Sequence, residues 1–328
     1  FKRRLTRRAG TRPFTRMSWS PDGQLLATAS YDQTIRIWNP ETGEIVRTIP
    51  GHNSSVFAIT IAPDSRFALS ASKNNLKYWQ LAASERPITL TGHKDYVYAV
   101  AISPDGRLAV SGGYDQSVKV WDLETRQEIH TFRGHWGRVN SIIITPDGRF
   151  AISGAGDRTV RFWALAQMQH YRTMTGHTNE VLTLALSPDG QILASAGDDG
   201  SIYLWKIDSG RRCQVLSTHN KVITSLSFSG DGRFLASKSA DGRVILWHTD
   251  TWQTAVTLTE PHSGFSFASL AFHPTAPVLA TQGHNEKMIR IWDLDESLLL
   301  ATKKEGLASF ASPSLAVVGE VSQSAALR

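Results

Sequence analysis

A repeat of about 42 residues runs through most of this 328-residue chain, and it limits the possible folds more than any other feature. Each unit carries one tryptophan at the same position, and the seven are Trp38, Trp79, Trp121, Trp163, Trp205, Trp247 and Trp292. A Gly-His pair recurs at residues 51–52, 92–93, 134–135 and 176–177, and a Pro-Asp-Gly turn recurs at residues 21–23, 104–106, 146–148 and 188–190. Three markers that stay in phase indicate one supersecondary unit copied along the chain.

Each unit is predicted to contain four short strands. In the third unit we expect them at residues 98–103, 107–112, 117–121 and 128–132, from alternating apolar residues and from β-branched or aromatic runs. Proline and glycine suit the turn between the first two strands, because proline presets φ and glycine tolerates a positive φ. Such a small sheet cannot bury both faces alone, but radially stacked sheets cover one another. The sequence therefore predicts an all-β, seven-bladed β-propeller of four-stranded antiparallel blades, with eight blades as the alternative.

The order of the markers resembles that of the WD-repeat family of β-propellers, from about residue 14 to residue 302. Gly-His is followed by Pro-Asp-Gly, then by an aspartate and a tryptophan, and two copies end in the Trp-Asp pair (residues 121–122 and 292–293). The resemblance implies that each blade holds a hydrogen-bonded tetrad of His, Ser or Thr, Asp and Trp. The four complete tetrads are His93, Ser111, Asp115 and Trp121; His135, Ser153, Asp157 and Trp163; His177, Ser195, Asp199 and Trp205; and His219, Ser237, Asp241 and Trp247.

A serine, a histidine and an aspartate together also suggest nucleophilic catalysis. That chemistry needs one exposed nucleophile beside an oxyanion hole. Here the trio occurs four times at one spacing, each time with an indole N–H that needs an acceptor. We therefore interpret the trios as structural and predict that the protein is not an enzyme.

Units one, two and seven depart from this pattern, so we expect their blades to be less tightly connected. Ala9 and Gly10 stand in unit one where Gly-His is expected. Lys73 and Asn74 replace the aspartate of unit two, and Glu286 lies one residue beyond the place of the aspartate in unit seven.

Two segments compete for the outer strand of the last blade, namely residues 3–8 and residues 298–302. The repeat pattern assigns residues 1–302 to the propeller and residues 303–328 to a tail or to the start of a further domain. Three interpretations of 303–328 stay open: an eighth blade, a disordered tail, or a segment that resembles the first strand and phosphate loop of a small GTPase. The last lacks the Gly-Lys-Ser that binds phosphate, so we predict no nucleotide binding.

The formal net charge of +6 comes from the N-terminal arm. Residues 1–16 contain seven basic side chains and no acidic one, and the remainder has 28 basic against 29 acidic residues. The arm has the charge to bind phosphates, but we favour its interpretation as a solvated strand or a cloning remnant. We do not expect nucleic acid to be a partner.

Other signals of chemistry are absent from the sequence. Cys213 is the one cysteine, so neither a disulfide nor a multi-thiolate metal site can form, and we expect a structural thiol in a cytoplasmic protein. No histidine pair has metal-ligand spacing and no apolar run is long enough to cross a membrane. We expect no metal and no cofactor.

In the family that this chain resembles, the connections between blades and those before the tetrad aspartates meet on one face, which often binds partners. The residues at these positions are Tyr31, Lys94, Tyr96, Tyr114, Trp136, Arg138, Glu180 and Asp198. Tyrosine, tryptophan and arginine dominate interface energies. We therefore predict a non-catalytic scaffold, a monomeric propeller that binds proteins or peptides. The alternatives are a regulatory domain of a larger bacterial signalling protein and phosphate or nucleic-acid binding through the arm.

Overall fold

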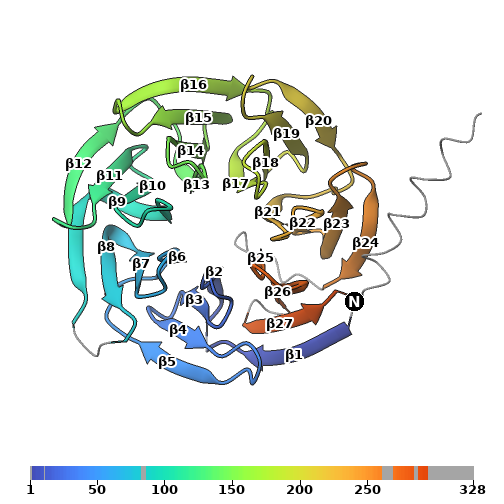
Figure 1. The fold of residues 1–328 in the computed structure, drawn as a ribbon, viewed down its shortest axis with the longest axis horizontal. Coiled ribbons are helices and arrows are strands. Elements are labelled where there is room, and N and C mark those ends of the chain that lie inside the picture. Colours follow the sequence, from blue (N-terminus) through green and yellow to red (C-terminus); the bar gives the residue numbers. More distant parts are fainter. Residues whose placement is uncertain (1, 11, 83–85, 261–268, 284–286, 295–328) are drawn as a thin grey trace, which may run out of the picture. The chain divides into compact units, whose positions relative to one another are not determined.

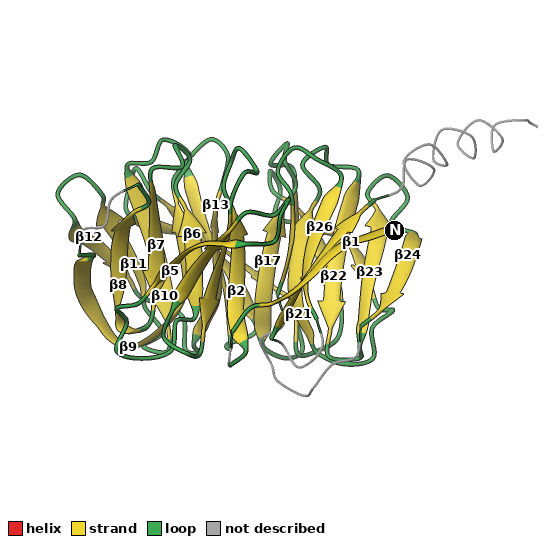
Figure 2. Cartoon of the chain, turned by 90° about the horizontal axis from the view of Figure 1, so that it is seen from below, coloured by secondary structure: helices red, strands yellow, loops and turns green. Residues whose placement is uncertain are grey.

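The structure is a computed structural model, and it describes residues 2–10, 12–82, 86–260, 269–283 and 287–294. Throughout these ranges the regular structure consists of β-strands, with no helix (Figure 2). Residues 1–293 form one compact unit. Within it the strands form antiparallel sheets that stand around a central opening (Figure 1).

Four sheets follow the chain order, with the first strand innermost and the last outermost (Figure 1). The first contains β2 (Phe14–Trp19), β3 (Leu26–Ser30), β4 (Ile35–Trp38) and β5 (Ile45–Ile49). The second contains β13 (Val139–Ile144), β14 (Phe150–Ala155), β15 (Thr159–Ala164) and β16 (Gln169–Thr175). The third contains β17 (Val181–Leu186), β18 (Ile192–Gly197), β19 (Ile202–Lys206) and β20 (Arg212–Leu216). The fourth contains β21 (Ile223–Phe228), β22 (Phe234–Ser239), β23 (Arg243–His248) and β24 (Thr254–Thr259).

A seven-stranded sheet joins two repeat units. Its strands are β6 (Ala58–Ile61), β7 (Phe67–Ala71), β8 (Lys73–Gln80), β9 (Ile88–Ile102), β10 (Leu108–Gly113), β11 (Val118–Asp122) and β12 (Gln127–Phe132). The prediction of a separate strand at residues 98–103 is wrong, because β9 is continuous from Ile88. Its first part pairs with β8 and its last part pairs with β10. Lys73 of β8 pairs with Tyr96 of β9. Because the turn of unit two is shortened, strand pairing continues across this point, whereas in the four-stranded sheets it ends there.

The last sheet contains strands from both ends of the described chain. Its members are β25 (Leu270–Phe272), β26 (Val278–Gln282), β27 (Met288–Asp293) and β1 (Lys2–Arg8), with β1 outermost. Lys2 pairs with Asp293 and Arg8 with Met288. The N-terminal segment thus occupies the outer position, and the competing residues 298–302 lie outside the described residues, as do 303–328. The basic arm is a strand of the ring, and Arg4 forms ion pairs with Glu41 and Asp293 at 2.7 and 2.6 Å.

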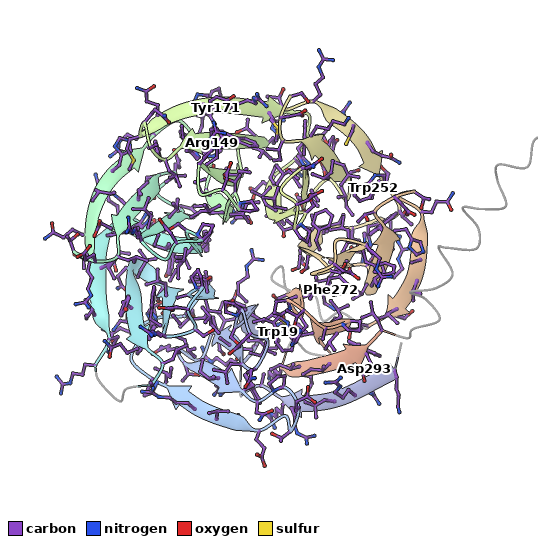
Figure 3. The ribbon with its side chains drawn as sticks, in the orientation of Figure 1. Trp19, Arg149, Tyr171, Trp252, Phe272 and Asp293 are labelled. Carbon is purple, nitrogen blue, oxygen red and sulfur yellow. The ribbon has the colours of Figure 1, made fainter. Side chains whose placement is uncertain are left out.

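The hydrophobic core lies between neighbouring sheets. Every residue of β3 and of β7 is buried, whereas four of the five residues of the outer strand β20 are exposed. The repeat tryptophans fill the spaces between sheets: Trp163 stacks on Phe132 of the preceding sheet, with 4.9 Å between ring centroids. Figure 3 shows Trp19 and Phe272 near the central opening and Tyr171 at the outer rim. The chain is therefore an all-β propeller of four-stranded antiparallel blades.

Candidate interaction surface

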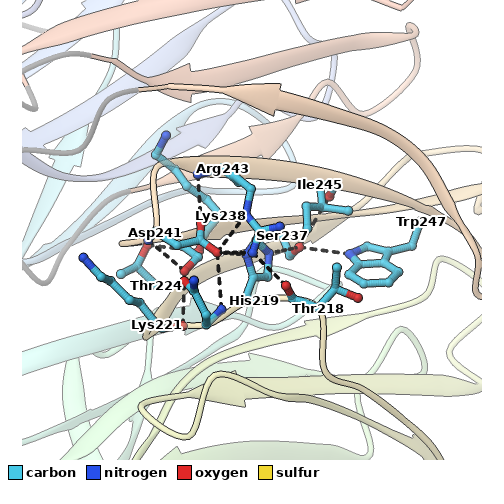
Figure 4. A network of polar contacts seen from close by, with 12 residues as sticks. Thr218, His219, Lys221, Thr224, Ser237, Lys238, Asp241, Arg243, Ile245 and Trp247 are labelled. Carbon is cyan, nitrogen blue, oxygen red and sulfur yellow. Dashed lines mark hydrogen bonds and ion pairs between the residues drawn. The ribbon is translucent and has the colours of Figure 1, made fainter.

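Each regular blade contains a buried chain of hydrogen bonds between the predicted tetrad residues. In the sheet of β14 and β15, Ser153 accepts a hydrogen bond from the Trp163 indole N–H at 2.8 Å and contacts His135 Nε2 at 2.7 Å. The other ring nitrogen of His135 lies 2.8 Å from Asp157 Oδ2. The same three contacts, at 2.7–2.9 Å, join the tetrads of His93, His177 and His219, and Figure 4 shows the last of these.

The tetrad aspartate also holds the loop on the surface. Asp157 Oδ2 accepts a hydrogen bond from the Trp136 backbone N–H at 3.1 Å, and Oδ1 accepts one from the Thr159 hydroxyl at 2.7 Å. Burial acts to raise the pKa of Asp157, but these bonds and the contact with His135 outweigh it and hold the pKa at about 2. Asp157 is therefore a carboxylate at neutral pH. Asp115 holds the Lys94 N–H in the same way, at 2.9 Å.

The tetrads do not present a nucleophile to solvent. Ser111, Ser153, Ser195 and Ser237 are fully buried. Each hydroxyl is engaged by both the histidine and the tryptophan of its own blade. This arrangement supports the role of joining strands within a blade, since a reacting serine has to meet a substrate.

Units one and two have incomplete tetrads. In unit one, Trp38 donates to Thr28 at 3.0 Å, and Asp32 forms an ion pair with Arg36 instead of meeting a histidine. In unit two, Ser70 contacts both Trp79 and His52, at 2.7 and 2.6 Å. Burial of His52, with a further contribution from the charge of Lys77, lowers its pKa to about 3.

A buried ionic cluster that was not predicted from the sequence joins units six and seven. Trp292 donates to Thr281 at 2.9 Å, and Thr281 donates to Glu260 at 2.7 Å. Glu260 is only 1% exposed and forms ion pairs with Lys238 at 2.5 Å and with Arg290 at 3.2 Å. The sequence does contain one indication of this cluster. Lys238 follows the tetrad serine of unit six, whereas alanine or glycine follows the tetrad Ser or Thr in five of the seven units. His262 and Glu286, which we assigned to unit seven, lie outside the described residues.

The predicted surface residues include an aromatic cluster, several strongly exposed side chains and a charged group at the channel mouth. Tyr31, Tyr96 and Tyr114 belong to an aromatic cluster that also includes Phe57 and Tyr98, with neighbouring ring centroids 5.2–6.5 Å apart. Trp136 is 81% exposed and Tyr114 is 52% exposed, and Lys94 is exposed as well. Arg138, Glu180 and Asp198 lie at the mouth of the central channel, where Arg138 Nη2 and Glu180 form an ion pair at 2.8 Å.

A cavity of about 150 Å³ opens at this mouth. Its lining consists of Arg16, Phe57, Tyr98, Arg138, Asn140, Glu180, Leu182, Asp198, Val222 and Thr224. Two of these residues, Phe57 just before β6 and Tyr98 on β9, were not predicted from the sequence. A register shift at Tyr98 omits it from the ladder with β10, and such a bulge redirects a side chain.

Comparison with known families gives the same repeats. The family model described as WD domain, G-beta repeat matches residues 4–39, 43–80, 84–122, 126–164, 168–206 and 210–248. These six segments cover more than half of the chain. The chain belongs to the WD-repeat family. Its buried tetrads are therefore the hydrogen-bonded tetrads that WD repeats are expected to carry.

Individual relatives match this WD-repeat chain over short segments. The U5 small nuclear ribonucleoprotein 40 kDa protein of Homo sapiens is 36% identical over 59 residues, which is 18% of this chain and 16% of the relative. Nuclear distribution protein PAC1 of Coccidioides posadasii is 46% identical over 54 residues, covering 16% and 12%. Target of rapamycin complex subunit LST8-1 of Arabidopsis thaliana is 43% identical over 53 residues, covering 16% and 17%. Each match spans less than a fifth of the relative's length.

Candidate metal sites and membrane-spanning helices are both absent from the described residues of this WD-repeat chain. Those residues include no cluster of three or more His, Cys, Asp or Glu side chains able to hold a metal ion. They also include no helix that is long and apolar enough to cross a membrane.

Proposed function

We propose that this WD-repeat protein is a non-catalytic scaffold that binds other proteins or peptides. Its binding surface, here named the interaction face, comprises Tyr31, Lys94, Tyr96, Tyr114, Trp136, Arg138, Glu180 and Asp198. The observation that carries the proposal is the exposure of Trp136 and Tyr114, at 81% and 52%, beside a channel mouth with an arginine. Tryptophan, tyrosine and arginine are the residue types that contribute most to protein interfaces.

The rigidity of the loops favours binding at this face. The backbone N–H groups of Lys94 and Trp136 are held by tetrad aspartates, at 2.9 and 3.1 Å. Ordering a surface loop during binding opposes association, so loops that are already fixed bind more tightly. Two of the relatives are named for larger assemblies, a ribonucleoprotein and a complex subunit, and a scaffold role agrees with those names.

We also propose that the ring has seven blades. β9 supports this number, because its two parts pair with different neighbours and thereby give one strand to each of two blades. The sheet that β1 completes supplies the last blade. A monomeric ring of this kind needs no second copy to cover its edges, since its first and last strands lie in the same sheet.

The proposal is tested by removing the interaction face without disturbing the blades. A variant with Tyr96, Tyr114, Trp136 and Arg138 all changed to Ala is compared with the wild type in affinity capture from a lysate, followed by mass spectrometry. Tyr171→Ala is the matched control, because Tyr171 is 53% exposed but lies on the outer strand β16. We expect the fourfold variant to lose partners that both the wild type and the control retain. An identical partner set for all three proteins would contradict the proposal.

A further inference from the structure

One position of the repeat differs in a single unit. The fifth residue before the proline of the turn, or before Gly230 in unit six, is small in six units: Ala58, Ala99, Ser141, Thr183, Ser225 and Ser269. These six residues line the central channel. In unit one the same position holds Arg16, which lines both the channel and the cavity at its mouth. One arginine therefore stands in a ring of small side chains.

The Arg16 guanidinium extends across the channel. Nη2 of Arg16, on β2, lies 3.4 Å from the carbonyl oxygen of Asn140, on β13. β2 and β13 stand on opposite sides of the central opening (Figure 1). A distance of 3.4 Å is long for a hydrogen bond, and a guanidinium has five N–H groups to donate. Among the described residues this is the one hydrogen bond of the Arg16 side chain, so most of its donors lack a protein acceptor.

The carboxylates of the cavity have partners of their own. Glu180 accepts two hydrogen bonds from Arg138, from Nη2 at 2.8 Å and from Nε at 3.1 Å. Asp198 accepts a hydrogen bond from the Asn179 side chain at 2.6 Å. No ion pair joins either carboxylate to Arg16 in the described part of the chain. Burial lowers the pKa of Arg16, which is the response of a cation that has lost water without gaining a counter-charge.

We propose that the channel mouth binds an acidic side chain of a partner peptide, with Arg16 as the residue that pairs with its carboxylate. A guanidinium matches a carboxylate through two parallel N–H···O bonds, and such a pair is strongest where water is excluded. Phe57, Tyr98 and Leu182 provide apolar walls for the aliphatic part of an aspartate or glutamate. A cavity of about 150 Å³ is large enough for a ring the size of benzene, so it accommodates such a side chain. This inference rests on the proposed function, because it concerns one part of the interaction face.

The experiment uses the intact chain and peptides selected on it. A phage-displayed library of random dodecapeptides is panned on immobilised wild-type protein, and the dissociation constants of the selected peptides are measured by calorimetry. Each peptide is tested against the wild type, Arg16→Ala and Arg172→Ala. Alanine already occupies the Arg16 position in two units, so this variant is expected to fold. Arg172 is the control because it lies on the outer strand β16, where it donates to the Ile207 and Asp208 carbonyl oxygens.

We expect the selected peptides to share an acidic residue at one position. Arg16→Ala should weaken their binding at least tenfold, and Arg172→Ala should leave it unchanged. Changing the acidic residue of the peptide to its amide should weaken binding to the wild type equally, without any further effect on Arg16→Ala. Peptides that bind wild type and Arg16→Ala equally, but lose binding to Trp136→Ala, would overturn this inference and leave the proposed function standing. A selection that yields no binding peptide would overturn both.

Discussion

Asp157 joins the interior of its blade to the interaction face, because one carboxylate oxygen contacts His135 at 2.8 Å and accepts the Trp136 N–H at 3.1 Å. The tetrad thereby fixes the backbone of the most exposed aromatic residue of that face. A change at this side chain should therefore affect both the stability of the blade and the proposed binding.

Asp157→Ala should lower the free energy of unfolding by about 1–3 kcal/mol, because it leaves His135 and the Trp136 N–H without an acceptor. Urea denaturation of the intact chain measures this change. Asp208→Ala, an exposed turn aspartate, is the control and should have no effect. A melting curve of Asp157→Ala that superimposes on that of the wild type would count against the structural role of the tetrads.

Glu260→Gln should destabilise the protein by about 3–5 kcal/mol, since it leaves the buried Lys238 and the partly buried Arg290 without a counter-charge. Adding Lys238→Ala to this variant removes the unpaired lysine and introduces a small residue, as five other units have at this position. The double variant should therefore recover part of the lost free energy of unfolding. Both variants are compared by urea denaturation. Equal stability of Glu260→Gln and wild type would show that the cluster does not hold the blade.

Mild acid should destabilise the protein through His52. Its pKa is about 3 in the folded chain, against about 6.5 for an unperturbed histidine. Between these values the unfolded chain holds a proton that the folded chain lacks, so stability falls as the pH decreases, by at most about 1.4 kcal/mol per pH unit. Burial also lowers the pKa of His135 and His219, where the contact with aspartate opposes the shift.

His52→Asn removes the titrating group and should therefore flatten the decrease in stability between pH 6.5 and 4. Unfolding in urea at several pH values measures both slopes. The prediction fails if the variant and the wild type show the same slope.

Arg16→Ala should leave the free energy of unfolding within about 0.5 kcal/mol of the wild type or raise it, because a partly desolvated cation is removed and little packing is lost. Thermal and urea unfolding of the two proteins measure the difference. A loss of several kcal/mol would instead assign Arg16 a structural role.

The repeat made local structure predictable. The spacing of turn and tryptophan placed three strands of the third unit within one residue of β10, β11 and β12. The same spacing predicted the four side chains of each regular tetrad, because equivalent strands and turns bring them together in every regular unit. These features depend on alternation and turn chemistry, which lie within a short stretch of sequence.

Features that depend on distant pairing were not predictable in this way. Residues 3–8 and 298–302 fit the last outer strand equally well, and only the pairing of β1 with β27 distinguishes them. The continuous β9 depends on Lys73 meeting Tyr96. Tyr98 was missed because a bulge, rather than simple alternation, turns its side chain toward the channel mouth. Phe57 lies just before β6, outside the strand, so strand alternation did not indicate it.

The central claim is that the face around Tyr96, Tyr114 and Trp136 binds protein partners. Hydrogen–deuterium exchange of the chain, alone and with a captured partner, tests it most directly. We predict that binding protects residues 94–98, 113–116 and 136–138, and that the outer strands β5, β12, β16 and β20 exchange as in the free protein. Protection confined to those outer strands would contradict the account.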